Sequence, residues 1–325
     1  MRQNLLKINK AGGDREFYWG VLSKEEQQLI NFELGSNRTS INELKNRNFV
    51  SGRFDYALDQ RRVAAIEFLK DDKSKRVLEI GCGYGGITFA LAKKFGSVVA
   101  IDATYELLEF TRLRLIGKKI SNVELFHVSK FEDQFEVAIQ GKFDLIVING
   151  VLEWVGSGTN KISPKIHQQE FMSKCESLLS EKGEIFLAIE NRWYPKWWIR
   201  DPHSKLPWTA ILPRGFANLY SKRKRSESYR TWIYSRFALK KLLRKSNLVI
   251  NKELFVLMTY RSPIWVESRE EFLGGEVLVG PNLNSLFWKK LTSISLLRKF
   301  LFPLVIPSFV LLLQSQTSQH ARVEE

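Results

Sequence analysis

Short apolar runs alternate with amphipathic stretches from residue 55 onward. The runs are rich in β-branched and other apolar residues, and we predict five strands, at 76–80, 98–101, 123–127, 143–148 and 184–189. Between them apolar residues recur at helical spacing, which predicts helices over 55–69, 87–95, 104–119 and 167–180. This βαβ order predicts an α/β fold with a doubly wound parallel sheet, which binds ligands at the carboxyl ends of its strands.

The alternation stops after residue 189. Residues 190–232 are rich in Pro, Trp and basic residues and show no long periodic segment, so we interpret them as an insertion. A helix at 235–246 and a strand at 248–258 resume the pattern. A second irregular stretch follows, and we predict a last buried strand at 308–313. The predicted organisation is an N-terminal cap over 1–54 and one domain over 55–325, with insertions at about 190–234 and 259–306.

The run at 301–313 also raises the question of a membrane segment. It is apolar except for Ser308, but it has 13 residues and contains Pro303 and Pro307. A helix that spans a bilayer needs about 20 apolar residues. A buried strand is therefore the favoured interpretation, and peripheral attachment of 286–306 to a membrane surface is the alternative.

Charge and cysteine content restrict the possible partners and cellular compartment of the protein. The net charge is +15, and residues 190–325 hold 23 Lys and Arg against 10 Asp and Glu, together with seven of the nine tryptophans. Such a basic, aromatic segment favours an anionic partner, either nucleic acid, a nucleotide-linked substrate or a membrane surface. Two cysteines cannot form a disulfide framework, and no Cys/His pattern predicts a metal site. No secretory signal is recognisable, so we expect a cytoplasmic protein, with contact at the inner membrane face as the alternative.

A glycine-rich loop follows the first predicted strand, in the segment VLEIGCGYGG at 77–86. Glycines permit a tight turn and a close approach of the backbone to a ligand. The GxGxxG spacing through Gly81 also fits a dinucleotide. Glu79 would repel a pyrophosphate but suits a cationic ligand. Asp102 ends the second strand, where a carboxylate can accept hydrogen bonds from both ribose hydroxyls.

These segments resemble the class I S-adenosylmethionine-dependent methyltransferases. The resemblance rests on VLEIGCGYGG, VVAID, FDLIVINGVLEWV and LLSEKGEIFLAIENR. It is strong over about residues 55–190 and weak over 235–258 and 308–313. It implies a Rossmann-like seven-stranded sheet with insertions after strands 5 and 6, and S-adenosylmethionine as the cofactor.

The resemblance also implies which residues contact the cofactor. Glu79, Gly81 and Gly83 would lie against the methionine end, Asp102 would bind the ribose, and Ala103 or Thr104 would flank the adenine. Ser129 stands where many members have an Asp that contacts the adenine amino group, which leaves this contact open. The full set of predicted cofactor residues is Glu79, Gly81, Cys82, Gly83, Asp102, Ala103, Ser129 and Asn149.

Methyl transfer is an in-line displacement, so catalysis can come largely from holding the acceptor near the methyl group. An oxygen acceptor also benefits from a base beside the strand ends. The candidates are Glu153 and Glu190, for which a structural hydrogen bond is the alternative, and His203, which we expect in a mobile segment. The residues expected to bind substrate are Trp154, Asn191, Arg192, Trp208, Arg214 and Tyr229.

The insertion carries a narrower resemblance. IENRWYPKWW, DPHSKLPW and LPRGFANLYS resemble a bacterial methyltransferase subgroup of polysaccharide and glycan biosynthesis. This implies O-methylation of a sugar or glycan intermediate, either nucleotide-linked or lipid-linked. Two alternatives are an RNA methyltransferase or non-catalytic RNA-binding protein that uses the basic run Lys222–Arg225, and a small-molecule or lipid methyltransferase at a membrane surface. We interpret the basic run as a solvated loop, which makes nucleic acid the weaker choice.

The sequence also argues against two kinds of base methylation. No proline-containing loop of the type used for amino methylation of bases follows the fourth strand. Methylation of a pyrimidine at C5 needs a nucleophilic thiolate. Cys82 lies in the glycine loop and Cys175 in a predicted helix, so neither cysteine fits that role.

Overall fold

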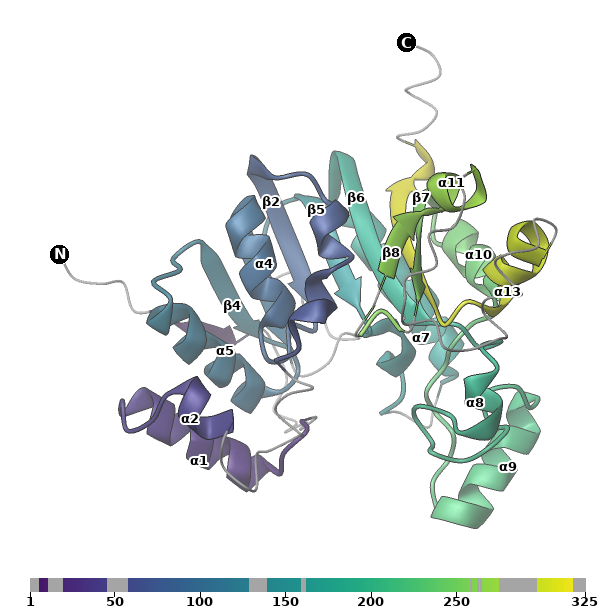
Figure 1. Cartoon of the computed structure of the whole chain (residues 1–325), viewed down its shortest axis with the longest axis horizontal. Coiled ribbons are helices and arrows are strands. Elements are labelled where there is room, and N and C mark those ends of the chain that lie inside the picture. Colours follow the sequence, from purple (N-terminus) through teal and green to yellow (C-terminus); the bar gives the residue numbers. More distant parts are fainter. Residues whose placement is uncertain are drawn as a thin grey trace, which may run out of the picture. The chain divides into compact units, whose positions relative to one another are not determined.

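The computed structural model describes residues 6–10, 20–45, 58–128, 139–158, 162–257, 259–261, 263, 265–274 and 297–317. The chain divides into two compact units (Figure 1). The first runs up to Ile148 and includes Leu178–Gly183, and the second comprises Asn149–Ser177 and the chain from Glu184 onward. Within the described ranges, no helix combines the length and the apolar character needed to cross a bilayer.

The first unit contains parallel strands in the spatial order β1, β4, β3, β2, β5. Their bounds are β1 Ile8–Lys10, β2 Asp72–Ile80, β3 Phe95–Asp102, β4 Val123–His127 and β5 Phe143–Asn149. Ile80 pairs with both Ile101 and Ile148, so three strands end at the same level. The predicted strands of this unit are therefore confirmed, and β1 is an additional edge strand.

Helices of the first unit follow the strands as the sequence predicted. They are α4 (Gly86–Lys94) after β2 and α5 (Tyr105–Gly117) after β3. Helix α1 (Lys24–Gly35) begins with a capping box between Ser23 and Glu26 and packs against α5, and α2 (Ile41–Lys45) follows it. An apolar cluster joins these elements and includes Ile30, Tyr84 and Phe110.

One predicted helix is wrong in its described part. The expected helix over 55–69 is replaced from residue 58 onward by two short 3₁₀ turns, η1 (Gln60–Val63) and η2 (Ile66–Phe68). Asp59 caps the first turn through the backbone N–H of Arg61, and Leu69 is already extended. Two i→i+3 turns are enough to bury Ala65 and Ile66, so the helical spacing does not require a continuous helix.

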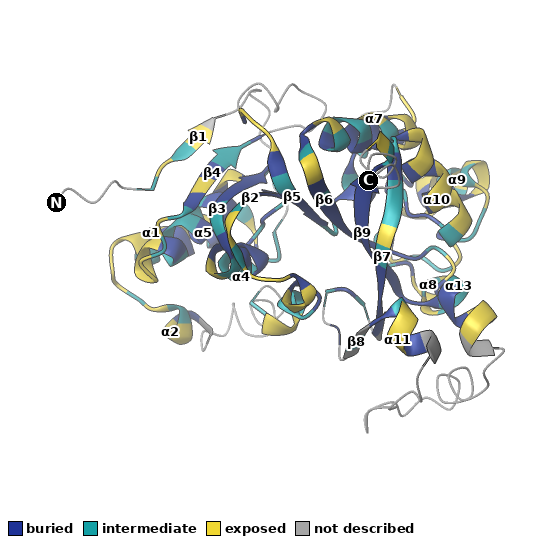
Figure 2. Ribbon diagram, turned by 90° about the horizontal axis from the view of Figure 1, so that it is seen from above, coloured by how far each residue is buried: buried dark blue, intermediate teal, exposed yellow. Residues whose placement is uncertain are grey.

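The second unit contains antiparallel strands in the order β6, β9, β7, β8. Their bounds are β6 Leu179–Glu190, β7 Leu248–Leu257, β8 Trp265–Ser268 and β9 Ser308–Ser315. All eight residues of β9 are buried, which confirms the predicted last strand (Figure 2). The first residues of β6 belong to the first unit. The short strand β8 is the second edge strand that the sequence pattern did not reveal.

Helices of the second unit surround these strands. Helix α10 (Arg236–Lys245) contacts both β7 and α7 (Pro164–Ser177), and α11 (Arg269–Gly274) contacts β7. Short turns complete the unit at η3 (Leu152–Trp154), η4 (Leu297–Leu301) and α13 (Phe302–Val305). The predicted helices 167–180 and 235–246 are confirmed, with boundaries shifted by one to three residues.

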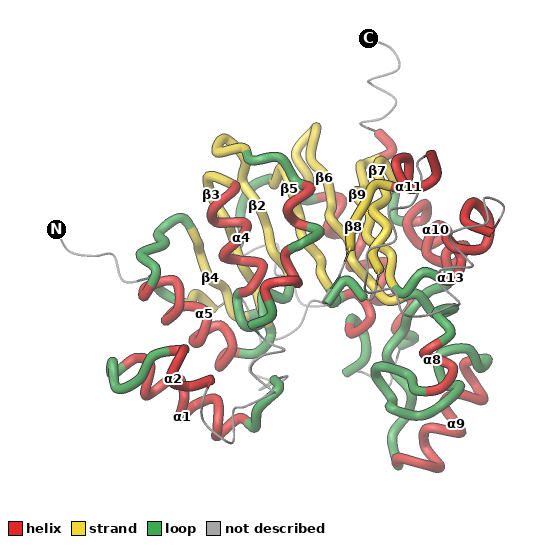
Figure 3. Tube along the Cα trace, in the orientation of Figure 1, coloured by secondary structure: helices red, strands yellow, loops and turns green. Residues whose placement is uncertain are grey.

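The segment between β6 and α10 is more ordered than predicted. It consists largely of loops, but it contains α8 (Lys196–Ile199) and the 12-residue helix α9 (Arg214–Arg225) (Figure 3). The expectation of no long periodic segment is therefore wrong. The basic run Lys222–Arg225 is exposed, but it forms the last turn of α9 and not a loop. Positive side chains are favourable there because the carboxyl end of a helix carries partial negative charge.

Candidate functional site

The glycine loop connects β2 to α4 in the first unit. The N–H groups of Gly81 and Cys82 both donate to the Ile101 carbonyl, which fixes the loop to the end of β3. Gly85 has a φ of +76° and precedes α4. A Cβ at this position would lie 2.7 Å from the Thr111 side chain. Only glycine therefore fits this turn without strain.

Asp102 holds the loop from the end of β3. Its buried carboxylate accepts hydrogen bonds from the backbone N–H groups of Gly83, at 2.7 Å, and Thr104, at 2.8 Å. Burial raises the pKa of Asp102, and the two backbone hydrogen bonds oppose that rise. A carboxylate offers about four lone-pair sites, so two hydroxyl groups can still be accepted. The residue thus lies where the sequence predicted it, with capacity for a ribose.

Glu79, which precedes the glycine loop, has a buried carboxyl group whose Oε2 atom has no hydrogen-bond partner among the described residues. Burial, reinforced by the negative charge of Asp102, raises the pKa of Glu79 to about 8. A buried carboxyl group is unfavourable unless its charge is compensated, and Thr88 and the positive charge of Arg62 oppose the rise in the pKa of Glu79 only in part. A cationic ligand would offset this cost, so the loop fits a sulfonium cofactor better than a pyrophosphate.

Other cofactor predictions are located as follows. Ala103 follows Asp102, and its carbonyl lies 3.1 Å from His127 Nε2. Asn149 is the last residue of β5, and its side-chain nitrogen has no partner in the described structure. Ser129 lies outside the described residues. The Cys82 thiol is buried, and burial raises its pKa well above the ordinary value. No observation tests these contacts directly, and they stay predictions.

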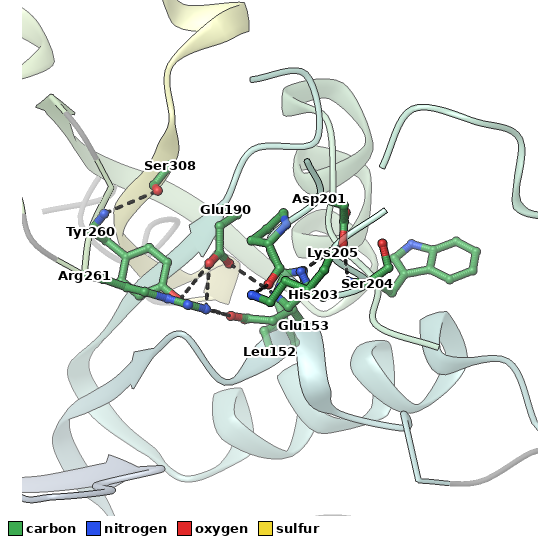
Figure 4. A network of polar contacts seen from close by, with 12 residues as sticks. Leu152, Glu153, Glu190, Asp201, His203, Ser204, Lys205, Tyr260, Arg261 and Ser308 are labelled. Atoms are coloured by element: carbon green, nitrogen blue, oxygen red, sulfur yellow. Dashed lines mark hydrogen bonds and ion pairs between the residues drawn. The ribbon is translucent and has the colours of Figure 1, made fainter. Parts of the chain in front are cut away.

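The second unit holds a buried polar network around two glutamates (Figure 4). Glu153 lies in η3 and Glu190 is the last residue of β6. The single O–H of Tyr260 lies between the two carboxyl groups, with its oxygen 3.1 Å from Oε1 of Glu153 and 3.3 Å from Oε1 of Glu190. Arg261 approaches the same atoms, with its Nη2 2.8 Å from Oε1 of Glu190. One oxygen of each carboxyl group is therefore held by Tyr260 and Arg261.

The Oε2 atom of Glu190 lies 3.9 Å from Nε2 of His203. The Oε2 atoms of Glu153 and Glu190 are buried and have no hydrogen-bond partner, and the same is true of both ring nitrogens of His203 within the described part of the chain. One ligand atom from each residue lies within 4.8 Å of the other two. We call these three residues the Glu–Glu–His cluster. The sequence predicted all three as candidates, and the structure brings them together.

The expectation that His203 lies in a mobile segment is wrong. Its side chain is 2% exposed and lies 3.9 Å from Oε2 of Glu190. The ring packs edge-on against Trp154, with 5.1 Å between the ring centroids. Its backbone N–H donates to Oδ1 of Asp201 at 2.9 Å. Packing and this turn together hold the imidazole in place.

Burial and charge shift the titration of the cluster. Burial and the neighbouring Glu190 raise the pKa of Glu153 well above its usual range. Burial also acts on Glu190, but Arg261 and His203 hold its pKa below the ordinary value. Burial lowers the pKa of His203. At neutral pH the pair of carboxyl groups therefore carries its negative charge on Glu190.

Tyr260 and Arg261 were not among the predicted site residues. Both fall in the stretch predicted as irregular, and neither belongs to a motif. The position of the Tyr260 ring depends on Gly150, which has a φ of +74°. A Cβ on Gly150 would lie 2.2 Å from the Tyr260 hydroxyl oxygen. Glycine after β5 thus makes room for the residue that orients both carboxyl groups.

Several predicted substrate residues have their polar groups engaged inside the second unit. Asn191 donates to the carbonyls of Leu304 and Ile306. Arg192 donates to the carbonyls of Ala210, Ile211 and Leu212, and its pKa is lowered by burial. Both residues hold the insertion in place. Contact between these groups and a substrate stays a prediction, for which the observed geometry offers no support.

Arg214 and Tyr229, like Asn191 and Arg192, use their polar groups in contacts within the second unit. The Arg214 guanidinium stacks over the rings of Tyr229 and Trp232, and it donates to the Thr231 carbonyl. The Tyr229 hydroxyl donates to Asp201. Burial lowers the pKa of Arg214 to about 10. Trp208 differs from both because it is 52% exposed.

Comparison with known proteins identifies part of the chain. Residues 71–219 match the family described as "Methyltransferase domain". This part of the chain is therefore similar to a methyltransferase domain. The strand order of the structure confirms the predicted α/β fold, and S-adenosylmethionine is the cofactor expected of a methyltransferase domain. The matched residues 71–219 include the glycine loop, Asp102, the Glu–Glu–His cluster and the first half of α9.

Curated relatives match part of this chain over part of their own length. A ubiquinone biosynthesis O-methyltransferase from Xanthomonas axonopodis pv. citri is 29% identical over 138 residues, which is 42% of this chain and 52% of that protein. A 23S rRNA (uracil(1939)-C(5))-methyltransferase from Shewanella frigidimarina is 26% identical over 156 residues, covering 45% of this chain and 33% of that protein. The chain thus spans about half, or less, of the relatives it matches.

Solved structures are also similar in part. PKMT2 from Rickettsia typhi has 19% sequence identity and a TM-score of 0.46, and the match covers 81% of this chain and 54% of that one. An S-adenosylmethionine-dependent methyltransferase from Clostridium acetobutylicum has 11% identity and a TM-score of 0.43, with 90% of this chain and 98% of that one covered.

Proposed function

We infer that the protein transfers a methyl group from S-adenosylmethionine to a hydroxyl group of a sugar or glycan intermediate. The observation that carries this proposal is the Glu–Glu–His cluster. Its three residues have buried acceptor atoms that lack hydrogen-bond partners among the described residues. When bound, the cofactor supplies an electrophilic methyl group on a cationic sulfur. The protein has to bind that cation and orient an acceptor.

The glycine loop is proposed to bind the cofactor. Glu79 would face the positive charge, and Asp102 would accept from the ribose hydroxyls while holding Gly83 in place. We also propose that the N-terminal segment caps this loop. The Tyr84 hydroxyl, which belongs to the loop, accepts a hydrogen bond from the backbone N–H of Val21.

The cluster favours a hydroxyl acceptor. Carboxylate oxygens and an unprotonated imidazole nitrogen accept hydrogen bonds, so a neutral O–H group matches them. Such a contact orients the acceptor oxygen, and orientation is the main requirement of an in-line displacement. Methylation of a pyrimidine carbon would instead require a thiolate. Both Cys82 and Cys175 are buried, which argues against that chemistry.

Exposed aromatic residues in the insertion support a sugar as the acceptor. Trp193, Trp198 and Trp208 are 37%, 38% and 52% exposed, and they lie in the same insertion as His203. Indole rings offer a flat apolar surface with a polar N–H group, and a sugar ring has apolar faces and a polar rim. We propose that the acceptor is carried on a nucleotide or a lipid, whose phosphates suit the basic second unit.

The test is methyl transfer with labelled cofactor. The full chain is incubated with methyl-labelled S-adenosylmethionine and, separately, nucleotide sugars, lipid-linked glycans, quinol precursors and total RNA. We expect label in an alkali-stable methyl ether of a sugar, and loss of most of that label with Trp208→Ala at unchanged cofactor affinity. Label in RNA or in a quinol, with sugars unlabelled, would overturn the glycan proposal. Absence of label from every pool would count against methyl transfer to these classes.

A further inference from the structure

We propose that Glu153, Glu190 and His203 bind a divalent metal ion. The ligand atoms are one carboxylate oxygen of Glu153, one of Glu190 and one ring nitrogen of His203, which lie within 4.8 Å of one another. They come from η3, the end of β6 and the insertion, and Figure 4 shows the two carboxyl groups and the imidazole converging. Neither the family match nor the relatives assign a metal to this position.

Unpartnered buried atoms are the first argument. Both Oε2 atoms and both His203 nitrogens are inaccessible to solvent and lack a partner among the described residues. A buried acceptor without a partner costs about 1–3 kcal/mol, and more when it is charged. Three such side chains close together lower the stability of the folded protein considerably unless a ligand binds to them. A cation contacts all of them at once.

The spacing is the second argument. Oxygen and nitrogen ligands lie about 2.0–2.2 Å from ions such as zinc, so two ligands on opposite sides of an ion are about 4 Å apart. The observed separation of at most 4.8 Å needs side-chain shifts of less than about 1 Å to close around an ion. Rotations of two Glu side chains supply such shifts.

The residues behind the ligands are the third argument. The Tyr260 O–H lies between the Oε1 atoms of both glutamates, and the Arg261 guanidinium donates in turn to the Tyr260 hydroxyl at 3.1 Å. Metal-binding carboxylates are commonly held in this way by hydrogen bonds to the oxygen that does not bind the metal. Arg261 also forms ion pairs with Oε1 of Glu190 and Oε1 of Glu153, so it helps to orient both carboxyl groups.

The donor set restricts the kind of ion. Two carboxylates and one imidazole suit Mn²⁺, Fe²⁺ or Zn²⁺, because Mg²⁺ and Ca²⁺ prefer sites made of oxygen alone and soft ions prefer thiolates. Three protein ligands leave coordination positions open. This part of the inference rests on the proposed function: with the ion bound, the acceptor hydroxyl takes one of these positions and is oriented by the ion in place of direct hydrogen bonds to the three side chains.

A Lys205 variant provides a control in which metal affinity should rise and not fall. It interacts electrostatically with Glu190 and Arg261, and burial lowers its pKa. Its positive charge competes with a metal ion for the same carboxylates. Removal of this charge in Lys205→Met should therefore strengthen metal binding, whereas loss of a ligand weakens it.

The experiment measures Mn²⁺ binding by electron paramagnetic resonance on the full chain after chelation and dialysis. We expect one ion per chain, affinity lowered at least 10-fold in Glu190→Gln and in His203→Gln, and affinity raised in Lys205→Met. His167→Gln is the matched control because His167 is also a buried histidine with unpartnered ring nitrogens. It should leave binding unchanged. Thermal unfolding of each variant shows whether it is folded.

A second measurement needs no variant. Pulsed electron paramagnetic resonance of the wild-type complex should detect one imidazole nitrogen coupled to Mn²⁺. Three results would overturn the proposal: no stoichiometric Mn²⁺ binding, no coupling of Mn²⁺ to an imidazole nitrogen, or unaltered Mn²⁺ affinity in both ligand variants. The two carboxyl groups would then share a proton instead of binding an ion. Full methyl transfer by metal-free protein would contradict the placement of the acceptor hydroxyl on the ion and would leave the proposed function intact. Metal binding without any hydroxyl methylation would contradict the proposed function and leave the metal site supported.

Discussion

The Tyr229 hydroxyl donates a 2.8 Å hydrogen bond to Oδ2 of Asp201, which lies 28 residues earlier in the chain. The other oxygen of Asp201 accepts from the backbone N–H groups of His203 and Ser204. One buried carboxylate therefore joins the two ends of the insertion and fixes the turn that carries His203. The position of the imidazole depends on a residue that has no direct contact with it.

The first prediction concerns that hydrogen bond. Tyr229→Phe leaves a buried carboxylate short of one donor, and a hydrogen bond to a charged group contributes about 1.5–3 kcal/mol. We expect the free energy of unfolding in urea to fall by that amount. Tyr220→Phe is the control, because the Tyr220 hydroxyl makes no hydrogen bond within the described residues. Equal stability of the two variants would show that Asp201 does not depend on Tyr229.

A second prediction compares two adjacent glycines at the start of α4. Gly85→Ala forces a side chain into the left-handed region and places its Cβ 2.7 Å from Thr111, whereas a Cβ on Gly86 meets nothing within 4 Å. Strain of this kind costs about 1–3 kcal/mol. We expect urea unfolding to show this loss for Gly85→Ala. For Gly86→Ala we expect no loss, or a gain of up to about 1 kcal/mol. Similar losses in both variants would contradict the assigned conformation.

The parallel strands and the cofactor loop could be predicted because their signals are local. A buried parallel strand is a continuous apolar run, and the loop between β2 and α4 needs glycine where φ is positive. The edge strands β1 and β8 have three and four residues, too few to show a period. Helix α9 was missed because only Ala217 and Ser221 are buried on it, and neither is strongly apolar.

The Glu–Glu–His cluster shows where prediction from sequence ends. Glu153 and Glu190 follow strands whose carboxyl ends are predictable, so both could be named in advance. Their partner Tyr260 lies more than 100 residues after Glu153, in a segment without periodicity. Its contact arises from the tertiary fold. For the same reason the sequence indicated no metal site, since the three ligands do not follow a motif with fixed spacing.

A third prediction tests Asp102 in cofactor binding. Asp102→Asn removes the charge that accepts from Gly83 and that would accept from ribose hydroxyls. We expect the dissociation constant for S-adenosylmethionine to rise more than 10-fold, which corresponds to about 1.5–3 kcal/mol. Calorimetry measures it directly.

Asp144→Asn is the matched control for Asp102. Asp144 also accepts a backbone N–H, from Arg76 at 2.9 Å, but it stands near the start of β5 and not at a carboxyl end. We expect this variant to lose stability and to keep its cofactor affinity. If Asp102→Asn and Asp144→Asn bind the cofactor equally well, the ribose assignment of Asp102 is wrong.

A fourth prediction concerns the stability of the protein without ligand as pH changes. The pKa of Glu79 rises from an ordinary 4.5 to about 8 in the folded protein. The folded state therefore binds more protons than the unfolded state between these values, so stability falls as pH rises from about 4.5 to about 8. We expect Glu79→Gln to remove this loss in urea unfolding measured at pH 5 and pH 8. Parallel pH profiles for the two proteins would exclude Glu79 as the cause.

The last prediction links the same carboxyl group to the cofactor. At pH 7 the uncomplexed Glu79 is protonated, because its pKa is about 8. A cationic ligand beside it favours the ionised form, so binding of S-adenosylmethionine releases a proton and affinity increases with pH up to about 8. Calorimetry in two buffers of different ionisation enthalpy counts the protons released. We expect close to one for the wild type and none for Glu79→Gln. Equal release by both proteins would transfer the effect to Asp102, whose pKa burial also raises, and would remove Glu79 from the cation site.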